Sequence, residues 1–402
     1  TDHDSFPTGV PPRAGKPRPI YQTSPALYDP VMTTRTDTAL AAAAALLAAT
    51  PSAFPALLGF DGFVDDIIDV VDKRHAHDRY DRLLTIPSFA GKIAAAAGQS
   101  SNMEMVIKQQ KLGGNGPIMA NAMAALGLPT TYVGTTGYPA PHPGFNEFAR
   151  KATLLPLAQP AHTSALEFSD GKIMLGNRAS LAEGTWDRIL SHVGLESFRA
   201  LCDTAALIGA VNWTMLPHLT PIWQHLLTDI LPTLSKKPRL FFVDLADPEK
   251  RLPADLLAAL SVLCEINLIT PVVLGLNLSE ALQVAAALEL PCEPLPPLAT
   301  LAATLRQALK LNTVVIHPRT GAAAATADEV AQFEGPFIQS PRISTGAGDH
   351  FNAGFVFSRL LGLSLPQALA AATATSGYYV RTALSPTLPA LAEFLNHLPP
   401  PE

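Results

Sequence analysis

The amino-acid sequence predicts an α/β fold, in which a central, mostly parallel β-sheet is covered by helices on both faces. Short apolar runs of β-prone residues alternate with longer stretches rich in alanine and leucine, which is the pattern of βαβ units. The short runs are apolar throughout, as expected for strands that are buried on both faces. Hydrophobic residues make up 48% of the 402 residues, so the chain can build a large core.

The beginning of the sequence differs from this pattern. Residues 1 to about 35 are rich in proline, threonine, aspartate and arginine and show no apolar period, so we interpret them as an extended N-terminal arm. Residues 36–402 contain no internal repeat and no low-complexity linker, and we interpret them as one domain. The alanine-rich run Ala39–Ala49 predicts its first helix.

Six apolar runs predict the strands of the sheet. A stretch long enough for a helix separates each run from the next, and such crossovers join parallel strands. The runs are Leu57–Phe60, Thr131–Val133, Ala206–Val211, Leu240–Val243, Val272–Leu276 and Thr313–Ile316.

One segment predicts a β-hairpin without an intervening helix. Two β-prone runs, Ser164–Phe168 and Lys172–Gly176, flank the glycine-containing turn Ser169–Gly171. A small antiparallel sheet set apart from the main one is therefore expected. This hairpin is either a lid over a site or a plain surface hairpin.

Polar residues follow the predicted strands directly or lie close behind them. In open α/β sheets, ligands bind in a crevice outside the carboxyl ends of the strands, so these residues are candidates for one site. The alternative is that they belong to ordinary loops. They are Asp61, Asp65, Asn212, Asp244, Asn277 and His317.

A glycine turn at Thr345–Asp349 opens a predicted helix. Gly346 and Gly348 lack side chains, so backbone N–H groups can approach a ligand closely, and a helix N-terminus attracts negative charge. That combination suits a phosphate group, with Asp349 near enough to reach an attacking hydroxyl. In the alternative interpretation, the glycines form a tight turn and Asp349 caps the helix. The turn is neither a dinucleotide fingerprint nor a Walker loop, because Phe351 replaces the third glycine and no Gly-Lys-Ser/Thr follows.

These residues resemble the ribokinase-like, PfkB-type carbohydrate kinase family. The run Ile343–Phe351 is similar to its C-terminal signature, and Gly113-Gly114-Asn115 with Ala125-Leu126-Gly127 is similar to its N-terminal one. Asn277–Glu280 matches the family's NxxE motif, and Gly59–Asp65 matches its first strand with a sugar-binding aspartate. The landmarks stand in the family's order and cover about residues 55–395.

The resemblance implies a three-layer ribokinase-like fold with a small β lid around residues 164–176. It implies an ATP- and Mg²⁺-dependent kinase that phosphorylates a sugar or nucleoside hydroxyl, with Asp349 as base and the N–H groups of Gly346, Ala347 and Gly348 as anion hole. Mg²⁺ would be held through water by Glu280. The nucleotide would meet Asn277, Glu280, Thr345 and Gly321. The acceptor would meet Asp65, Asp61, Gly113, Gly114 and Asn115.

The sequence also departs from the family. Ile343 replaces the usual aspartate of the signature, which helps to bind potassium in some members, and the nucleotide loop His317–Gly321 is shorter than usual. These changes leave open a non-catalytic regulator that binds a sugar or a nucleotide. The run Ile118–Asn121 is similar to that of ADP-dependent sugar kinases, so ADP stays an alternative donor.

Composition restricts the partners and the compartment. The formal net charge is −6, with 28 basic and 34 acidic residues, which argues against nucleic acid as the main partner. Three separated cysteines, Cys202, Cys264 and Cys292, predict free thiols in a reducing cytoplasm. No apolar run approaches the length of a membrane span. The family resemblance further implies that a homodimer could form through the lid.

Overall fold

The computed structural model describes residues 34–292 and 294–402. Almost all of the arm predicted for residues 1–35 lies outside this range. The first helix is α1 (Arg35–Ala48), which confirms the helix predicted from the alanine-rich run. Thr34 and Asp37 begin it with a reciprocal capping box, in which each side chain accepts a hydrogen bond from the other residue's backbone N–H.

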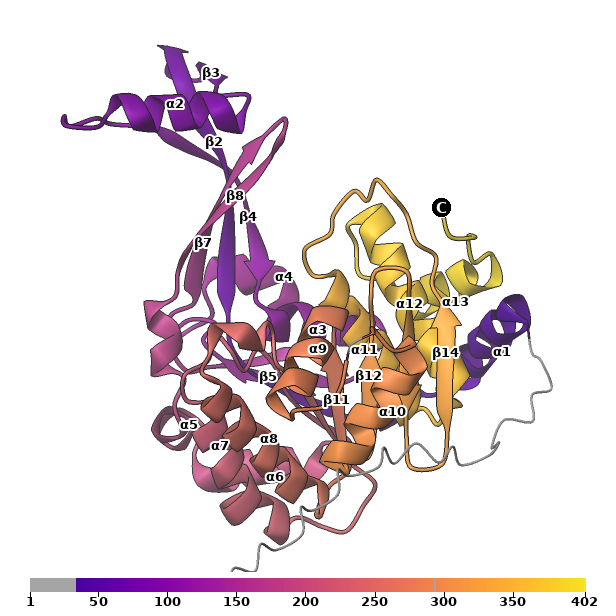
Figure 1. The fold of residues 1–402 in the computed structure, drawn as a ribbon. Helices are drawn as coiled ribbons and strands as arrows, with labels where there is room; N and C mark the ends of the chain where they lie inside the picture. The colour runs from indigo at the N-terminus through magenta and orange to yellow at the C-terminus, as the bar shows by residue number, and fades with distance from the viewer. Residues whose placement is uncertain (1–33, 293) are drawn as a thin grey trace, which may run out of the picture. The chain divides into compact units, whose positions relative to one another are not determined.

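A nine-stranded sheet forms the centre of the domain (Figure 1). The strand order is β14-β13-β12-β11-β10-β9-β1-β5-β6, with all neighbours parallel except at β13 and β14. The strands are β1 (Ala56–Phe60), β5 (Thr130–Gly134), β6 (Thr153–Pro156), β9 (Leu207–Ala210), β10 (Leu240–Asp244), β11 (Val272–Leu276), β12 (Thr313–Ile316), β13 (Gly321–Ala325) and β14 (Val330–Glu334).

All six predicted strands are confirmed as β1, β5, β9, β10, β11 and β12, whereas the parallel edge strand β6 was not predicted. Strand β13 was not predicted because Gly321–Ala325 is four alanines after a glycine, a composition that favours a helix. Its neighbour β14 shows alternating buried and exposed residues and lies at the edge of the sheet. The predicted α/β class, with a mostly parallel sheet, is therefore confirmed.

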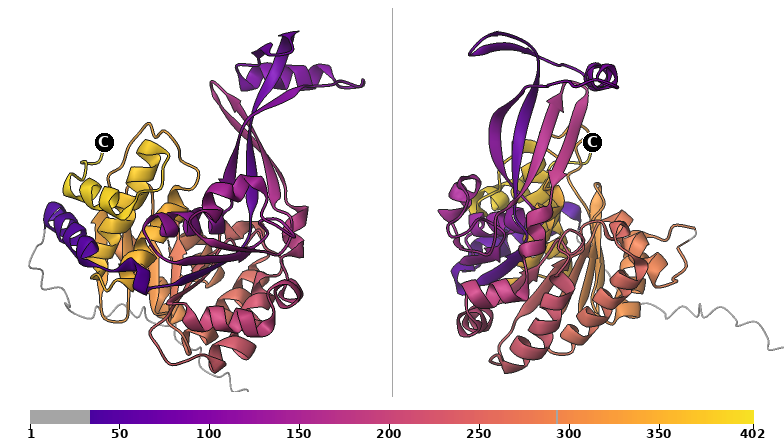
Figure 2. Two further views of the ribbon diagram at one scale, coloured as in Figure 1. Left: turned by 180° about the vertical axis from the view of Figure 1, so that it is seen from behind. Right: turned by 90° about the vertical axis from the view of Figure 1, so that its left-hand side faces the viewer.

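Helices cover both faces of this sheet (Figure 2, right). Successive side chains of one strand enter different cores: Phe241 and Val243 pack on one face, and Phe242 packs on the other. The first core is closed by α5 (Trp186–His192), α6 (Leu195–Thr204), α7 (Leu219–His225), α8 (Pro253–Asn267), α9 (Leu278–Ala287) and α10 (Leu298–Leu309). The second is closed by α1, α3 (Asn115–Ala125), α4 (Asn146–Ala149), α11 (Ala347–Leu360), α12 (Leu365–Thr382) and α13 (Leu388–Asn396).

A second, five-stranded sheet projects from the main one, and we call it the lid sheet (Figures 1 and 2). Strand β2 is its centre, flanked by antiparallel β4 on one side and parallel β7 on the other. Helix α2 packs a small separate core with it, which includes Phe89 and Phe168. The elements are β2 (Phe63–Ala76), β3 (Arg79–Arg82), α2 (Ile86–Ala95), β4 (Met105–Gly113), β7 (Ala161–Phe168) and β8 (Gly171–Asn177).

The predicted hairpin is confirmed as β7 and β8, and its turn lies at the predicted place. The lid sheet is larger than this hairpin, because residues 63–113 add three strands and a helix that the sequence did not predict. Strand β2 carries four aspartates, a residue depleted in strands, so its sequence does not look like a strand. One reason it forms is that it pairs with three other strands.

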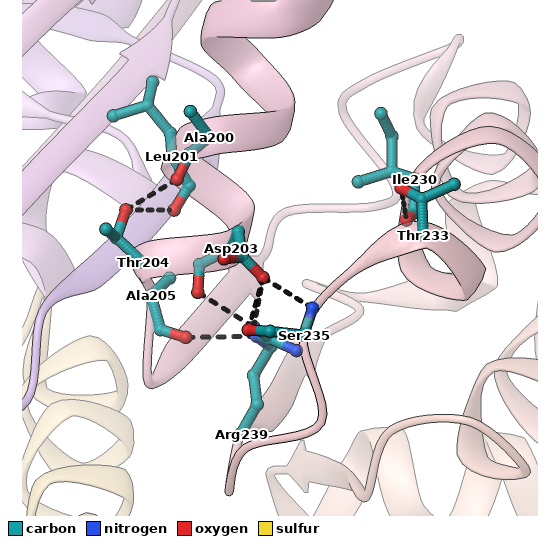
Figure 3. A network of polar contacts seen from close by, with 9 residues as sticks. All are labelled: Ala200, Leu201, Asp203, Thr204, Ala205, Ile230, Thr233, Ser235 and Arg239. Carbon is teal, nitrogen blue, oxygen red and sulfur yellow. Dashed lines mark hydrogen bonds and ion pairs between the residues drawn. The ribbon is translucent and has the colours of Figure 1, made fainter.

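Hydrogen bonds connect the loop before β10 to the end of α6 (Figure 3). The backbone N–H and the hydroxyl of Ser235 donate to Asp203 Oδ1 at 2.7 and 2.6 Å. The buried Arg239 side chain donates to the carbonyl oxygens of Ala205 and Asp203, both at 3.0 Å. This network holds the amino end of β10, at the opposite end of the sheet from the polar residues that follow the strands.

Short helical turns complete the described chain. They are Pro51–Ala53, Pro143–Phe145, Ala179–Glu183, Leu226–Ile230, Leu231–Thr233 and Pro248–Lys250. Among the described residues, no helix is both long enough and apolar enough to cross a membrane.

Candidate active site

The polar residues that follow the strands lie together at the carboxyl end of the sheet. The chain moves from β1 to β5 in one direction and later returns to β9 on the other side of β1. Such a reversal leaves a crevice beside the strand at which it occurs. Asp61 follows β1 and Asn212 lies just after β9, and Asn212 Nδ2 donates to Asp61 Oδ2 at 2.6 Å.

The glycine turn lies at the N-terminus of α11, as predicted. Gly346 is the N-cap residue, with φ of 86°, a left-handed conformation that glycine adopts without strain. The N–H of Ala347 donates to Ser344 O at 3.2 Å and closes the turn. The N–H of Gly348 has no backbone acceptor among the described residues. This N–H and the helix terminus are therefore available to an anion.

Asp349 is buried in the first turn of α11, with 6% of its surface exposed. Asn115 Nδ2 donates to its Oδ1 at 3.0 Å, and no other described residue donates to its Oδ2. Burial, reinforced by the negative charges of Asp61 and Glu280, raises the pKa of Asp349 to about 8. A carboxyl group with an open oxygen and a raised pKa can accept the proton of a nearby hydroxyl.

Two adjacent glycines, Gly113 and Gly114, make room for the carboxylates of Asp65 and Asp61. A Cβ atom at Gly113 would lie 2.7 Å from the carboxylate oxygens of Asp65, and one at Gly114 would lie 2.7 Å from Asp61 Oδ2. Gly114 also has φ of 93°. The pair therefore allows β4 and α3 to approach both aspartates closely, which brings Asn115 to Asp349.

The two aspartates have different surroundings. Asp61 is fully buried, and its carboxylate accepts hydrogen bonds from Asn212, from the N–H of Gly116 and from the hydroxyl of Tyr132. Burial, partly offset by these bonds, raises the pKa of Asp61 to about 6. Asp65 lies on β2, where burial raises its pKa, and Thr163, Lys172 and Lys111 partly offset this rise.

A cavity of about 60 Å³ lies between the lid sheet and the core. Asp65, Lys111 and Lys172 line it from the lid sheet, and Thr345 and Tyr379 line it from the core. Lys111 stands directly opposite Asp65 in the pairing of β2 with β4. The cavity thus joins the predicted sugar-binding aspartate to the glycine turn.

The predicted NxxE motif is a capping box at the start of α9. Asn277 Oδ1 accepts from the N–H of Glu280 at 3.0 Å, and Glu280 Oε2 accepts from the N–H of Asn277 at 2.8 Å. Glu280 Oε1 accepts from the N–H of Asp247 at 2.9 Å. Burial still raises the pKa of Glu280 above its usual value, despite these backbone bonds.

Asp244, at the end of β10, shares this acidic region. Its carboxylate accepts from Asn352 Nδ2 at 2.7 Å and from the N–H of Ala246 at 2.9 Å. Burial, and then repulsion from Glu280 and Asp349, raise the pKa of Asp244 well above its usual value. Three acidic side chains therefore lie within electrostatic reach of one another.

A second cavity, of about 350 Å³, lies on the other side of the glycine turn. Ala347 and Gly348 line one wall, Asn277 and His317 another, and Gly321 lies at the start of β13. His317 stacks on Phe351 with ring centroids 4.5 Å apart, and its buried Nε2 has no hydrogen-bond partner among the described residues. The remaining lining comes from Pro318, Arg319, Ser344, Phe351, residues 335–341 and α12.

The structure brings the predicted residues to one crevice, with the glycine turn between the two cavities. Asp65, Gly113, Gly114, Asn115 and Asp61 lie on the lid side. Asn277, Glu280 and Gly321 lie on the other side. Thr345, predicted on the nucleotide side, lines the cavity on the lid side.

Sequence reasoning missed three residues of this site: Lys111, Lys172 and Tyr379. The two lysines come from lid strands, and β4 was not predicted at all. Tyr379 lies near the end of α12, and no local motif marks it. Asp244 was already among the candidates that follow the predicted strands.

Comparison with known proteins gives the same family. Residues 32–398 match the family model described as prokaryotic ketohexokinase. A protein of Haloferax volcanii named ketohexokinase is 29% identical over 342 residues, which cover 85% of this chain and 90% of that protein.

Solved structures share the fold at low sequence identity. A point mutant of phosphofructokinase-2 from Escherichia coli has a TM-score of 0.60 and 13% identity, covering 86% of this chain and 99% of that one. Ribokinase from Arabidopsis thaliana, solved with ribose and ATP, has a TM-score of 0.58 and 16% identity, covering 85% and 98%. The ribokinase-like fold predicted from the motifs is therefore confirmed. The chain belongs to the prokaryotic ketohexokinase family, and it is a sugar kinase, a phosphotransferase with an alcohol group as acceptor.

Proposed function

We propose that this kinase transfers the terminal phosphoryl group of ATP to a hydroxyl of a ketohexose, with Asp349 as general base. The observation that carries the proposal is the position of Asp349. Its Oδ2 is open, its carboxyl is buried, and it follows a helix N-terminus that separates the two cavities. The name of the Haloferax relative supports a ketohexose as the acceptor.

Phosphoryl transfer depends mainly on positioning and on stabilisation of charge. Asp349 Oδ2 would orient the acceptor hydroxyl and accept its proton as the oxygen attacks. The N–H groups of Gly346, Ala347 and Gly348, together with the positive end of α11, would stabilise charge on the transferred group. The Ala347 N–H contributes only if it is shared with Ser344, to which it donates in this structure.

The acceptor would lie in the cavity on the lid side. Asp65 would accept hydrogen bonds from sugar hydroxyls, with Asn115 beside it and the backbone of Gly113 and Gly114 close by. Asp61 is a weaker candidate, because its carboxylate already accepts three bonds from the protein.

The nucleotide would lie in the cavity on the other side, against Gly321, Asn277 and the first turn of α11. The residues present fit Mg²⁺, because burial and then repulsion from Glu280 and Asp349 raise the pKa of Asp244, and a divalent cation would relieve that repulsion. Glu280 already accepts two backbone N–H bonds, which suits contact with the ion through water. The ion would neutralise charge on the phosphates.

Two alternative functions are less well supported. A non-catalytic regulator would not need the open, buried carboxyl of Asp349 beside unpaired backbone donors. ADP as donor rested on the run Ile118–Asn121, and the matched family and the Haloferax relative give it no support. A coupled assay with ATP or ADP, Mg²⁺ and a panel of ketohexoses, aldohexoses, pentoses and nucleosides tests the proposal. Turnover confined to ADP or to nucleosides would contradict it.

Replacing Asp65 with asparagine is expected to weaken acceptor use. A hydrogen bond to a charged group is worth about 1.5–3 kcal/mol, so kcat/KM for the sugar should fall about 10–100-fold. Steady-state kinetics with the sugar varied at saturating ATP measures this. The matched control is Asp66→Asn, because Asp66 is the next residue of β2, points to the opposite face and accepts from Gln110. Equal effects of the two changes would contradict the role of Asp65.

Replacing Glu280 with glutamine is expected to raise the Mg²⁺ concentration required for half-maximal activity by at least about 10-fold, because one negative charge leaves the acidic region. The amide oxygen can still accept one of the two backbone bonds, so α9 keeps part of its cap. Titration of activity with Mg²⁺ at fixed ATP measures the change. Glu265→Gln, an exposed site on α8, is the control. An unchanged Mg²⁺ requirement would refute a metal role for Glu280.

We further propose a cytoplasmic location and a homodimer formed through the lid sheet. All three cysteines are free thiols, which suits a reducing compartment. Exposed apolar side chains on the lid strands, among them Met105, Ile107, Met174 and Leu175, support a partner for that sheet. Light scattering coupled to size-exclusion chromatography distinguishes a dimer from a monomer.

A further inference from the structure

We propose that His350 and Tyr379 are positioning residues, which hold the carbonyl groups of the glycine turn so that its N–H groups face the transferred phosphoryl group. The proposal rests on the function proposed for Asp349 and its turn. His350 lies within the run Ile343–Phe351, but the resemblance gives it no role, and Tyr379 lies outside the motifs. Neither residue is assigned a part in the reaction above.

His350 holds the Gly346 carbonyl. It follows Asp349 in α11 and is 1% exposed. Its Nδ1 lies 2.8 Å from Gly346 O, and its Nε2 lies 2.9 Å from the hydroxyl of Ser385. A carbonyl oxygen only accepts, so Nδ1 carries the proton and Nε2 accepts from the hydroxyl. Burial lowers the pKa of His350 to about 4, so this neutral form is the one present near neutral pH.

Tyr379 holds the preceding carbonyl. Its hydroxyl donates to Thr345 O at 3.0 Å from the last part of α12. Its ring stacks on that of His350, with centroids 3.6 Å apart and planes 12° apart. The two side chains therefore support each other and bind two consecutive carbonyl groups of the turn.

Fixing these carbonyls fixes the N–H groups that follow them. A trans peptide is planar, so its C=O and N–H point in opposite directions. The hydroxyl of Tyr379 thereby sets the direction of the Gly346 N–H. Nδ1 of His350 sets that of the Ala347 N–H, which Ser344 O shares at 3.2 Å. Gly346 lies between them and, as a glycine, has a wider range of allowed backbone angles than other residues, so outside support helps the turn to keep one shape.

The rest of the neighbourhood anchors the same unit. Asn121 Nδ2 donates to Ser385 Oγ at 3.3 Å, which places α3 against the hydroxyl that serves His350. The N–H of Arg342 donates to Val380 O at 2.8 Å, so the chain entering the turn is tied to α12 next to Tyr379. Preorganised donors of this kind stabilise a transition state without reorganising during the reaction.

Paired substitutions at His350 separate the hydrogen bond from the ring. Asparagine keeps an N–H donor near the place of Nδ1 and loses the ring, whereas phenylalanine keeps a stacked ring of similar size and loses the donor. We expect kcat to fall about 10-fold or more in His350→Phe. This loss is smaller than the about 10²–10³-fold loss typical of removing an anion-hole donor, because the donor is kept and only its direction is less fixed. We expect it to stay within about threefold of wild type in His350→Asn. Equal losses in both variants would overturn the role of the donor.

Tyr379→Phe tests the second carbonyl. Tyr379 also lines the cavity on the lid side, so it could contact the sugar directly. A positioning role predicts that kcat falls about 10-fold while the KM for the sugar changes less than about twofold. A raised KM with unchanged kcat would instead show a sugar contact and overturn the proposal. Tyr378→Phe is the matched control, because that ring packs on Phe394, away from the turn.

Hydrogen exchange gives a readout independent of activity. The peptide that covers residues 343–350 should exchange faster in His350→Phe and Tyr379→Phe than in wild type, His350→Asn or Tyr378→Phe. If wild-type enzyme phosphorylates no sugar, the proposed function fails, and the exchange rates still decide whether these residues hold the turn. Unchanged exchange in both phenylalanine variants would overturn the proposal.

Discussion

Replacing Asp349 with asparagine is expected to lower kcat at least about 10²-fold and to leave the fold intact. A positioned general base contributes typically about 10²–10⁴-fold, and asparagine cannot accept the proton of the hydroxyl. The amide oxygen can still accept the hydrogen bond from Asn115 Nδ2, so the packing at the start of α11 is kept. A coupled assay at saturating sugar and ATP measures the loss, and circular dichroism confirms the fold.

The same variant should be more stable than wild type at alkaline pH. The pKa of Asp349 is about 8 in the folded protein, far above its usual value, so ionisation costs folding free energy as pH rises from about 4 through 8. Asparagine removes this cost. At pH 8 its free energy of unfolding should exceed that of wild type by ~2–4 kcal/mol, and its melting temperature should be higher. Both differences should vanish towards pH 4. Asp255→Asn, on the first turn of α8, is the control for stability.

For the kinetic experiment, near-normal turnover in Asp349→Asn would refute the role of Asp349 as general base.

Activity is expected to rise with pH up to about 8. Burial raises the pKa of Asp349 to about 8, so most free enzyme carries it protonated at pH 6 and only the ionised fraction can act as a base. That fraction changes about 10-fold per pH unit below the pKa, so kcat/KM at pH 6 should be about 100-fold below its alkaline plateau.

The profile should be measured at two ATP levels. Limiting Mg²⁺–ATP reports the free enzyme, whereas saturating Mg²⁺–ATP adds a cation near Asp349 and should move the inflection to lower pH, because positive charge favours the carboxylate. Asp61, Asp244 and Glu280 face the same crevice with raised pKa values, so the inflection belongs to the group as a whole. A flat profile between pH 6 and 8 at limiting ATP would contradict the protonated state of Asp349.

The parallel core of this fold could be predicted from the sequence, because buried parallel strands carry a local signal. Val272–Leu276 and Thr313–Ile316 were predicted with their observed bounds, since each is a short apolar run that ends at a polar residue. The strand–helix alternation then led to the three-layer arrangement. In these segments, local composition and tertiary position agree.

The lid sheet could be predicted only in part, because its strands depend on partners distant in the sequence. The hairpin Ala161–Asn177 has a glycine turn and local pairing, so it was found. Strand β2 has a local partner in β3, but the turn between them contains no glycine, and its other partners, β4 and β7, are distant in the sequence. Its aspartates are accommodated by contacts with neighbouring strands, such as Asp66 with Gln110 and Asp69 with Arg82.

The site was predicted where chemistry and spacing are local, and it was missed elsewhere. Asp349 and the glycine turn are contiguous, so their role could be proposed from one short segment. The reason for Gly113 and Gly114 appears only in the structure, where they make room for Asp65 and Asp61. Tyr379 contacts Thr345, which lies 34 positions away in the sequence, and no sequence motif predicts this contact.

The most direct test of phosphoryl transfer by Asp349 is phosphorus and proton NMR of the complete reaction with fructose as the ketohexose, Mg²⁺ and ATP. We expect ADP and a fructose phosphate ester to appear in equal amounts with wild-type enzyme, and at least about 10² times more slowly with Asp349→Asn. Release of inorganic phosphate without a sugar ester, or equal ester formation by both proteins, would contradict this expectation.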